Sequence, residues 1–143
     1  MLSKVPFEVP AYLLEKTRDL EKVRMAVAGA DNPVALESAR QAAEAGLIEP
    51  VLVGDADLIR AIAKETGWDI SGIEIVDAAG EDRAPAAAVA LARAGEVAAL
   101  MKGHVHTDAL MKAVVSRDLG LRTDRRLSHV FHMTIPGSER VLL

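Results

Sequence analysis

Cysteine is absent from this 143-residue sequence, aromatic residues make up 3% of it, and no long apolar run occurs. Without cysteine there are no disulfides and no thiolate metal ligands, which is compatible with a reducing cytoplasm. The few aromatic rings and a net charge of −4, with no basic tail, argue against a nucleic-acid surface. Arg93 and Glu96 interrupt the alanine-rich segment, so no stretch is long enough to span a bilayer. We therefore expect a cytoplasmic protein with no nucleic-acid and no membrane partner.

Two nucleotide-binding motifs are missing as well. Neither a G-x-G-x-x-G fingerprint nor a Walker A pattern occurs, so a standard NAD or ATP site has no support. What the sequence does have is 50% hydrophobic and 27% charged residues, the balance of a globular chain. Its length suits one domain with a core.

Apolar strand-like segments alternate with helix-like segments along the chain. We expect strands at 23–30, 51–53, 73–76, 97–101 and 127–135. We expect helices at 7–22, 33–43, 57–66, 83–94 and 107–117. Such alternation predicts right-handed βαβ units and a mostly parallel, doubly wound sheet in a three-layer α/β/α domain. Residues 1–22 are a leading helix or linker, and residues 23–143 form the domain.

The apolar run at 141–143 resembles the start of another strand. It is either a short antiparallel edge strand that closes the sheet, or a core element of a longer polypeptide.

The densest functional signal follows the fourth expected strand. The apolar run breaks into Lys102 and Gly103, and Thr107 is placed to cap the next helix. A cation, a glycine and a helix N-terminus then meet at the carboxyl end of a buried strand, where open α/β sheets bind ligands and anions. Lys112, in the second turn of that helix, could reach back toward the same anion. The alternative for both lysines is an ordinary solvated side chain.

All four histidines fall in the last third of the chain, at positions 104, 106, 129 and 132. Their H-x-H and H-x-x-H spacings suggest zinc, but spacing alone does not provide convergent ligands, and we expect no metal. On a strand, His129 and His132 would point to opposite faces.

Three arginines, Arg122, Arg125 and Arg126, lie within five residues and could clamp a phosphate. The alternative is a solvated loop paired with Asp118 or Asp124. Ser128 follows at the start of the fifth expected strand and could donate a hydrogen bond to a ligand. It is outside any G-x-S-x-G motif, so we do not interpret it as a nucleophile.

Segment 99–114, which contains Lys102 and Lys112, and segment 126–133, which contains Ser128, resemble the phosphate acetyltransferase/phosphate butyryltransferase family. Segment 39–54 is also similar, and the resemblance covers about residues 23–143. Lys112 stands where many acetyltransferases of the family have arginine, which is closer to butyryl-type or hydratase-fused members.

The resemblance implies an isocitrate/isopropylmalate dehydrogenase-like fold, a homodimer, and a reversible reaction in which acyl-CoA and inorganic phosphate give acyl phosphate and CoA. No cofactor is permanently bound, and phosphate attacks the thioester directly in a cleft between two α/β domains. By motif, phosphate or CoA would contact Lys102, Gly103, Thr107, Lys112 and Ser128.

The family's chains are longer, and their second half supplies a serine–arginine pair and an aspartate that activate phosphate. These catalytic residues would lie beyond Leu143, so we expect a domain truncated at its C-terminal end and defective on its own.

Two alternatives remain open. Asp31, Asp77 and Lys102 superficially mimic the acidic pocket and lysine of a receiver, a flavodoxin-like signalling module without enzymatic activity. A receiver, however, needs paired acids after its first strand, and here Asp31 is followed by Asn32. A pure assembly module is the third possibility.

Overall fold

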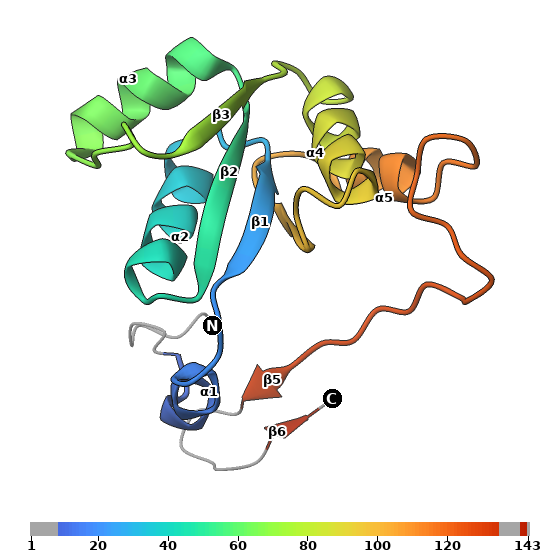
Figure 1. Ribbon diagram of the computed structural model, residues 1–143, viewed down its shortest axis with the longest axis horizontal. Helices are drawn as coiled ribbons and strands as arrows, with labels where there is room; N and C mark the ends of the chain where they lie inside the picture. Colours follow the sequence, from blue (N-terminus) through green and yellow to red (C-terminus); the bar gives the residue numbers. More distant parts are fainter. Residues whose placement is uncertain (1–8, 135–140, 143) are drawn as a thin grey trace, which may run out of the picture.

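A four-stranded parallel sheet in the order β3-β2-β1-β4 forms the centre of the computed structural model, which describes residues 9–134 and 141–142 (Figure 1). The strands are β1 (Val23–Ala28), β2 (Ile48–Gly54), β3 (Glu74–Asp77) and β4 (Ala99–Lys102). Val23 lies opposite Ile48 and Ala28 opposite Val53, so the two central strands run in register over their whole shared length. The predicted parallel sheet is confirmed.

Helices cover both faces of this sheet and make three layers (Figure 1). One face packs against α2 (Pro33–Glu44) and α3 (Ala56–Thr66), and the other against α4 (Arg83–Arg93) and α5 (Thr107–Val114). Because side chains alternate along a strand, Val27 and Leu52 pack toward α2 and α3, while Ala26 and Val53 pack toward α4. All four are fully buried. Both faces are thus apolar, as a parallel sheet requires.

The ends of the helices follow local sequence signals. The Asn32 side chain caps α2 by accepting a hydrogen bond from the Val34 N–H at 2.9 Å, and Asp55 caps α3 in the same way. Gly67 ends α3 with a φ of 69°, in the left-handed region where glycine has no steric penalty. Each of these helix ends is thus set by residues within a few positions of it.

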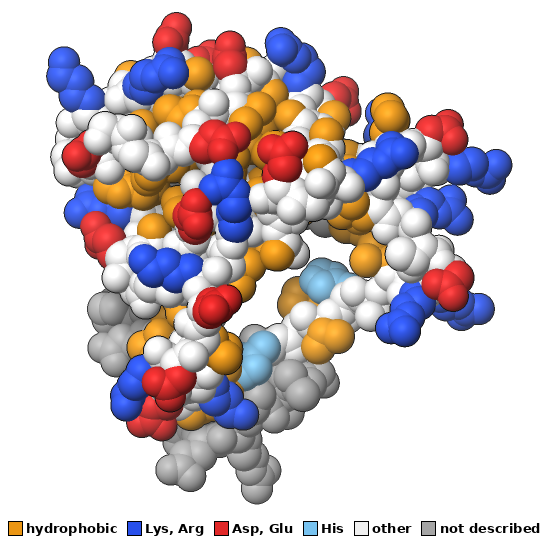
Figure 2. All heavy atoms as spheres, in the orientation of Figure 1, with side chains coloured by type: hydrophobic (Ala, Val, Ile, Leu, Met, Phe, Trp, Pro, Cys, Tyr) orange, Lys and Arg blue, Asp and Glu red, His pale blue; other side chains and the backbone are white. Residues whose placement is uncertain are grey.

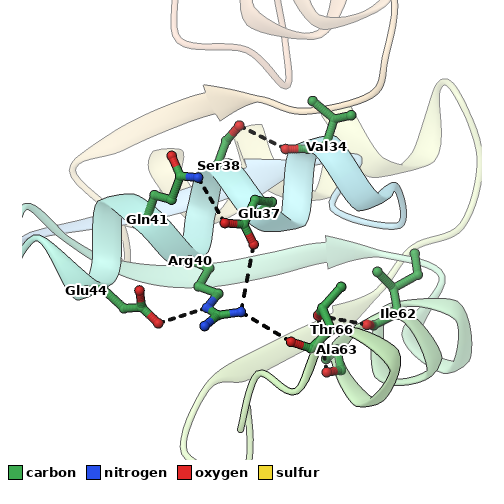
Figure 3. Close-up of polar contacts among 9 residues, drawn as sticks. All are labelled: Val34, Glu37, Ser38, Arg40, Gln41, Glu44, Ile62, Ala63 and Thr66. Atoms are coloured by element: carbon green, nitrogen blue, oxygen red, sulfur yellow. Dashed lines mark hydrogen bonds and ion pairs between the residues drawn. The ribbon is translucent and has the colours of Figure 1, made fainter. Parts of the chain in front are cut away.

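Arg40 joins the two helices of one layer (Figure 3). Its guanidinium bonds Glu44 at 2.8 Å on its own helix and donates to the Thr66 carbonyl at the end of α3, at 3.3 Å. The α3 carbonyl would otherwise lack an intrahelical partner, so the contact satisfies a helix end while it holds α2 beside α3.

The structure corrects the predicted fifth strand. Residues 127–132 form no strand, and β5 (Met133–Thr134) pairs antiparallel with β6 (Val141–Leu142) in a separate two-stranded sheet. The apolar run near 141 therefore does form an antiparallel strand, but it does not close the main sheet. Ile135 and Leu143 lie outside the described residues. Alternating sequence indicates extended backbone, but a strand also needs an adjacent edge, and Leu127 and Val130 remain 61% and 69% exposed.

Two helices also differ from the prediction. The leading helix α1 spans only Ala11–Thr17 and lies beside β5, near the amino ends of the sheet strands (Figure 1). Thr107 is not the cap of α5 but its first residue, and His106 is the N-cap. The His106 N–H donates to the carboxylate of Glu81, so a contact distant in sequence sets where this helix begins. The helix ends at Val114, not Arg117.

Candidate functional site

At the carboxyl edge of the sheet, the loops that leave two neighbouring strands, β1 and β4, lead in opposite directions. β1 lies between β2 and β4, so the chain leaving β1 crosses toward β2, while β4 lies on the other side. The loops that follow β1 (29–32) and β4 (103–106) therefore flank a topological switch point, the usual ligand site of an open α/β sheet.

These two loops are joined through Gly103. Its N–H donates to the Ala28 carbonyl at 2.8 Å, and the His104 N–H donates to the Gly29 carbonyl at 2.9 Å. A Cβ at position 103 would lie 2.4 Å from the Gly29 oxygen. The glycine predicted to admit a ligand is therefore first of all a requirement for the close approach of two loops.

Lys102 and Gly103 line a small hollow of about 130 Å³ at this point, opposite the start of α2. Asn32, Ser38 and His104 contribute its polar groups. The Lys102 ammonium donates to the Gly103 carbonyl at 3.5 Å, and no carboxylate of the described residues forms an ion pair with it. An uncompensated cation thus stands at the switch point, where it can neutralise a small anion.

The helix N-terminus beside this hollow is already satisfied. The Asn32 oxygen accepts from the N–H groups of Val34 and Ala35, at 2.9 and 3.4 Å. The Ser38 hydroxyl likewise donates to the Val34 carbonyl at 2.8 Å, so the Lys102 ammonium and the Asn32 amide N–H groups are the donors left for an anion in the hollow, rather than free N–H groups of α2.

Lys112 lies in a different, more acidic setting. It lines a second hollow of about 310 Å³ together with Glu81, Asp82 and His106, and its ammonium is 3.8 Å from the Asp82 carboxylate. The His106 backbone N–H bonds the Glu81 carboxylate, and the imidazole adds a contact at 2.9 Å. The backbone hydrogen bond, with smaller help from the ring, holds the pKa of Glu81 below its ordinary value. Glu81 therefore keeps a negative charge at the start of α5.

Of the five residues predicted to contact phosphate or CoA, two share a hollow and three do not. Thr107 is exposed at the first position of α5 and lines neither the hollow of Lys102 nor that of Lys112. Ser128 is exposed in the segment between α5 and β5, and neither of these hollows contains it. A shared site for all five stays a prediction.

The four histidines do not form one site either. His129 packs on Phe131 with ring centroids 4.1 Å apart, and His132 contacts the Tyr12 hydroxyl. Within residues 9–134 and 141–142, no three histidine, aspartate or glutamate side chains converge on a point where they could hold a metal ion.

The aspartates that suggested a receiver have structural partners. Asp31 accepts from the Asp55 N–H at 3.0 Å, and Asp77 accepts from the Ala56 N–H at 3.3 Å. Both carboxylates thus hold the start of α3 against the neighbouring strands.

Sequence reasoning missed Glu81. A signal was available, because Glu81 follows β3 just after Gly80 and so lies at the same carboxyl edge as Lys102. A larger hollow of about 760 Å³ between α4 and α5, lined by five alanines together with Val89, Leu119 and polar side chains, was also not foreseen. It contains neither Lys102 nor Gly103, and its charged side chains are Asp82, Arg93 and Lys112, so Lys112 lines this hollow as well as the smaller acidic one.

No helix in the described part of the chain is long and apolar enough to cross a membrane.

Known proteins similar to this chain share one description. The family model "Phosphate acetyl/butaryl transferase" matches residues 10–88. A phosphate acetyltransferase of Rhizobium meliloti is 50% identical over 102 residues, which are 71% of this chain and 32% of that protein. A phosphate butyryltransferase of Clostridium beijerinckii is 35% identical over 130 residues, 91% of this chain and 43% of that protein. The matched part of this chain thus covers about a third of the first relative's length and less than half of the second's.

Solved structures agree at the level of the fold. The EutD phosphotransacetylase of Staphylococcus aureus superposes with a TM-score of 0.67 at 17% identity, covering 92% of this chain and 49% of that one. A phosphotransacetylase of Streptococcus pyogenes gives 0.63 at 12% identity, covering 73% of this chain and 40% of that one. On the family model and these relatives, the chain belongs to the phosphate acetyl/butyryl transferase family.

Proposed function

We propose that this chain takes part in reversible acyl transfer between CoA and inorganic phosphate, with Lys102 holding the phosphate. A phosphate oxygen attacks the thioester carbonyl, forming a C–O bond, and the C–S bond breaks to release CoA as the thiolate, which then takes up a proton. The observation that carries the proposal is the uncompensated Lys102 ammonium at the switch point of a family member. Membership alone would not say where on this chain the anion binds.

Each proposed contact has a defined task. The Lys102 ammonium offsets the charge of phosphate, which would otherwise be repelled by an acidic protein. Gly103 keeps the two loops close enough for Lys102 and Ser38 to face one hollow. Thr107 and Lys112 on α5, and Ser128 beyond it, are proposed contacts for the rest of the acyl-CoA. No catalytic residue is assigned among them, and no permanently bound cofactor is invoked.

Turnover by the 143-residue polypeptide alone is expected to be low. Acyl transfer needs donors aimed from several sides at the developing oxyanion and thiolate, in a site closed to water. The Lys102 hollow is small, and Lys102 is exposed. Assays of acyl phosphate formation with acetyl-, propionyl- and butyryl-CoA measure this directly. Rates like those of the longer family enzymes would contradict it.

Phosphate binding tests the proposal itself. Calorimetric titration with inorganic phosphate, alone and with CoA present, should show binding that Lys102→Ala weakens about tenfold, the effect of losing one hydrogen bond to a charged group. Lys64→Ala is the matched control, because Lys64 is an exposed lysine in the last turn of α3. Equal affinity for wild type and Lys102→Ala would refute the assignment. Phosphorylation of an aspartate by acetyl phosphate would instead favour a receiver.

The proposal extends to a homodimer in the cytoplasm, which rests on the family resemblance. Light scattering at micromolar concentration measures the mass of the particle, and a monomer would contradict the first part.

A further inference from the structure

A hollow of about 650 Å³ lies where α5 ends, and its chemistry differs from that of the other hollows. Its apolar part consists of Val114, Val115, Leu121 and Leu127, and three arginines line the remainder together with Thr123 and Asp124. The volume is within the range typical of small-molecule sites. An apolar surface bordered by several cations suits a ligand that has both a flat apolar part and more than one phosphate.

The segment that forms this hollow is tied back onto α5. The Leu121 N–H donates to the Val114 carbonyl at 2.8 Å, and the Arg125 N–H donates to the Thr123 hydroxyl at 3.1 Å. A Cβ at Gly120 would lie 2.5 Å from the Val114 oxygen, so the turn needs glycine. These contacts hold the loop against the end of α5.

The three arginines of the hollow, Arg122, Arg125 and Arg126, stand apart electrostatically. Elsewhere Arg24 and Arg40 are each paired with carboxylates. Within the described part of the chain, none of the three forms an ion pair, and Asp124 is the one acid that lines the hollow with them. Figure 2 shows several blue side chains, with fewer red ones among them, along the right-hand edge of the molecule, in the region of the segment after α5. This is a local positive excess in a chain of net charge −4.

The distance to the switch point suits one class of ligand. α5 has eight residues, so its two ends are separated by about 12 Å. It begins beside the loop that follows β4 and ends at the arginine hollow. A ligand that reaches Lys102 with one end and the arginines with the other must carry its reactive group and its phosphates on opposite ends of a flexible arm.

We propose that the arginine hollow binds the nucleotide end of CoA, with the adenine on the apolar residues and the phosphates on the guanidinium groups. This rests on the proposed function, since acyl-CoA has its thioester and its phosphorylated nucleotide at opposite ends. Arginine suits the task because its planar fork grips phosphate oxygens in pairs. Ser128 follows Leu127 in the chain but is not among the residues that line the hollow.

The experiment titrates the 143-residue chain with CoA, dephospho-CoA, pantetheine and inorganic pyrophosphate in a calorimeter. The test variant is Arg125→Gln/Arg126→Gln, and the matched control is Arg60→Gln/Arg117→Gln, which removes two exposed arginines outside the hollow. The test variant should bind CoA at least about tenfold more weakly, the effect of losing contacts between charged groups and phosphate. Its pantetheine affinity should not change, and the control should bind CoA within about twofold of wild type. Both variants should unfold at the wild-type temperature.

Three results would overturn the inference. They are unchanged CoA affinity in the test variant, equal wild-type affinity for pantetheine and CoA, and pyrophosphate binding as tight as that of CoA, which would indicate a surface for any polyphosphate. None of these results bears on the assignment of Lys102, which is tested by the affinity for inorganic phosphate. Conversely, loss of CoA affinity in the arginine variant with no effect of Lys102→Ala on phosphate would leave the nucleotide site standing and remove the proposed phosphate site.

Discussion

Replacing Gly103 by alanine should destabilise the fold whether or not a ligand is bound. The new Cβ would lie 2.4 Å from the Gly29 oxygen and 2.7 Å from the Ala28 oxygen, both of them backbone atoms that cannot rotate away. Relief requires the loops to part, which strains the bonds from the N–H groups of Gly103 and His104. Overpacking of this kind costs about 1–3 kcal/mol, which for a chain of this length lowers Tm by about 3–10 °C.

Calorimetry or circular dichroism of the ligand-free chain measures this shift. Gly72→Ala is the matched control, because a Cβ there meets nothing within 4 Å. It should leave Tm unchanged or raise it slightly, since alanine restricts the unfolded chain more than glycine does. A Gly103→Ala protein that melts within about 1 °C of wild type would show that the loops are not held as described.

Three further changes test the core, a cap and an ion pair. Ile59→Ala removes a fully buried side chain of α3 and should cost about 2–5 kcal/mol in denaturant unfolding, whereas Leu58→Ala, 46% exposed on the same helix, should change stability by under about 0.5 kcal/mol. Asn32→Ala removes the cap of α2 and should cost about 1 kcal/mol; a wild-type urea midpoint would contradict the cap. The Glu81 pKa is depressed in the folded state, so its contribution is present above the ordinary value of 4.5 and is lost as pH falls through the folded pKa. Glu81→Gln should therefore be less stable than wild type near pH 6, and the difference should shrink in unfolding titrations toward pH 3.

Some features of the candidate site could be predicted from the sequence, and others could not. Lys102 and Gly103 could be placed at the carboxyl end of a buried strand because an apolar run, a cation and a glycine are all local signals. The other side chains of their hollow could not be predicted, because they come from distant parts of the sequence. Asn32 and Ser38 come from 70 and 64 residues earlier in the chain and meet Lys102 only because β1 and β4 pair. Lys112, ten residues after Lys102, instead lines a hollow with two acids from the loop between β3 and α4.

The sequence by itself determined the repeating strand–helix order, the parallel class of the sheet and most helix ends. Caps such as Asn32 and stops such as Gly67 act over a few residues, and burial on both faces of a strand appears directly as a continuous apolar run. Only the tertiary structure decided that 127–132 has no neighbouring strand, that His106 rather than Thr107 is the N-cap of α5, and that the three arginines line one hollow with four apolar residues. Those outcomes depend on contacts between residues far apart in the chain, such as Glu81 with His106, and no local pattern encodes which distant partner will be present.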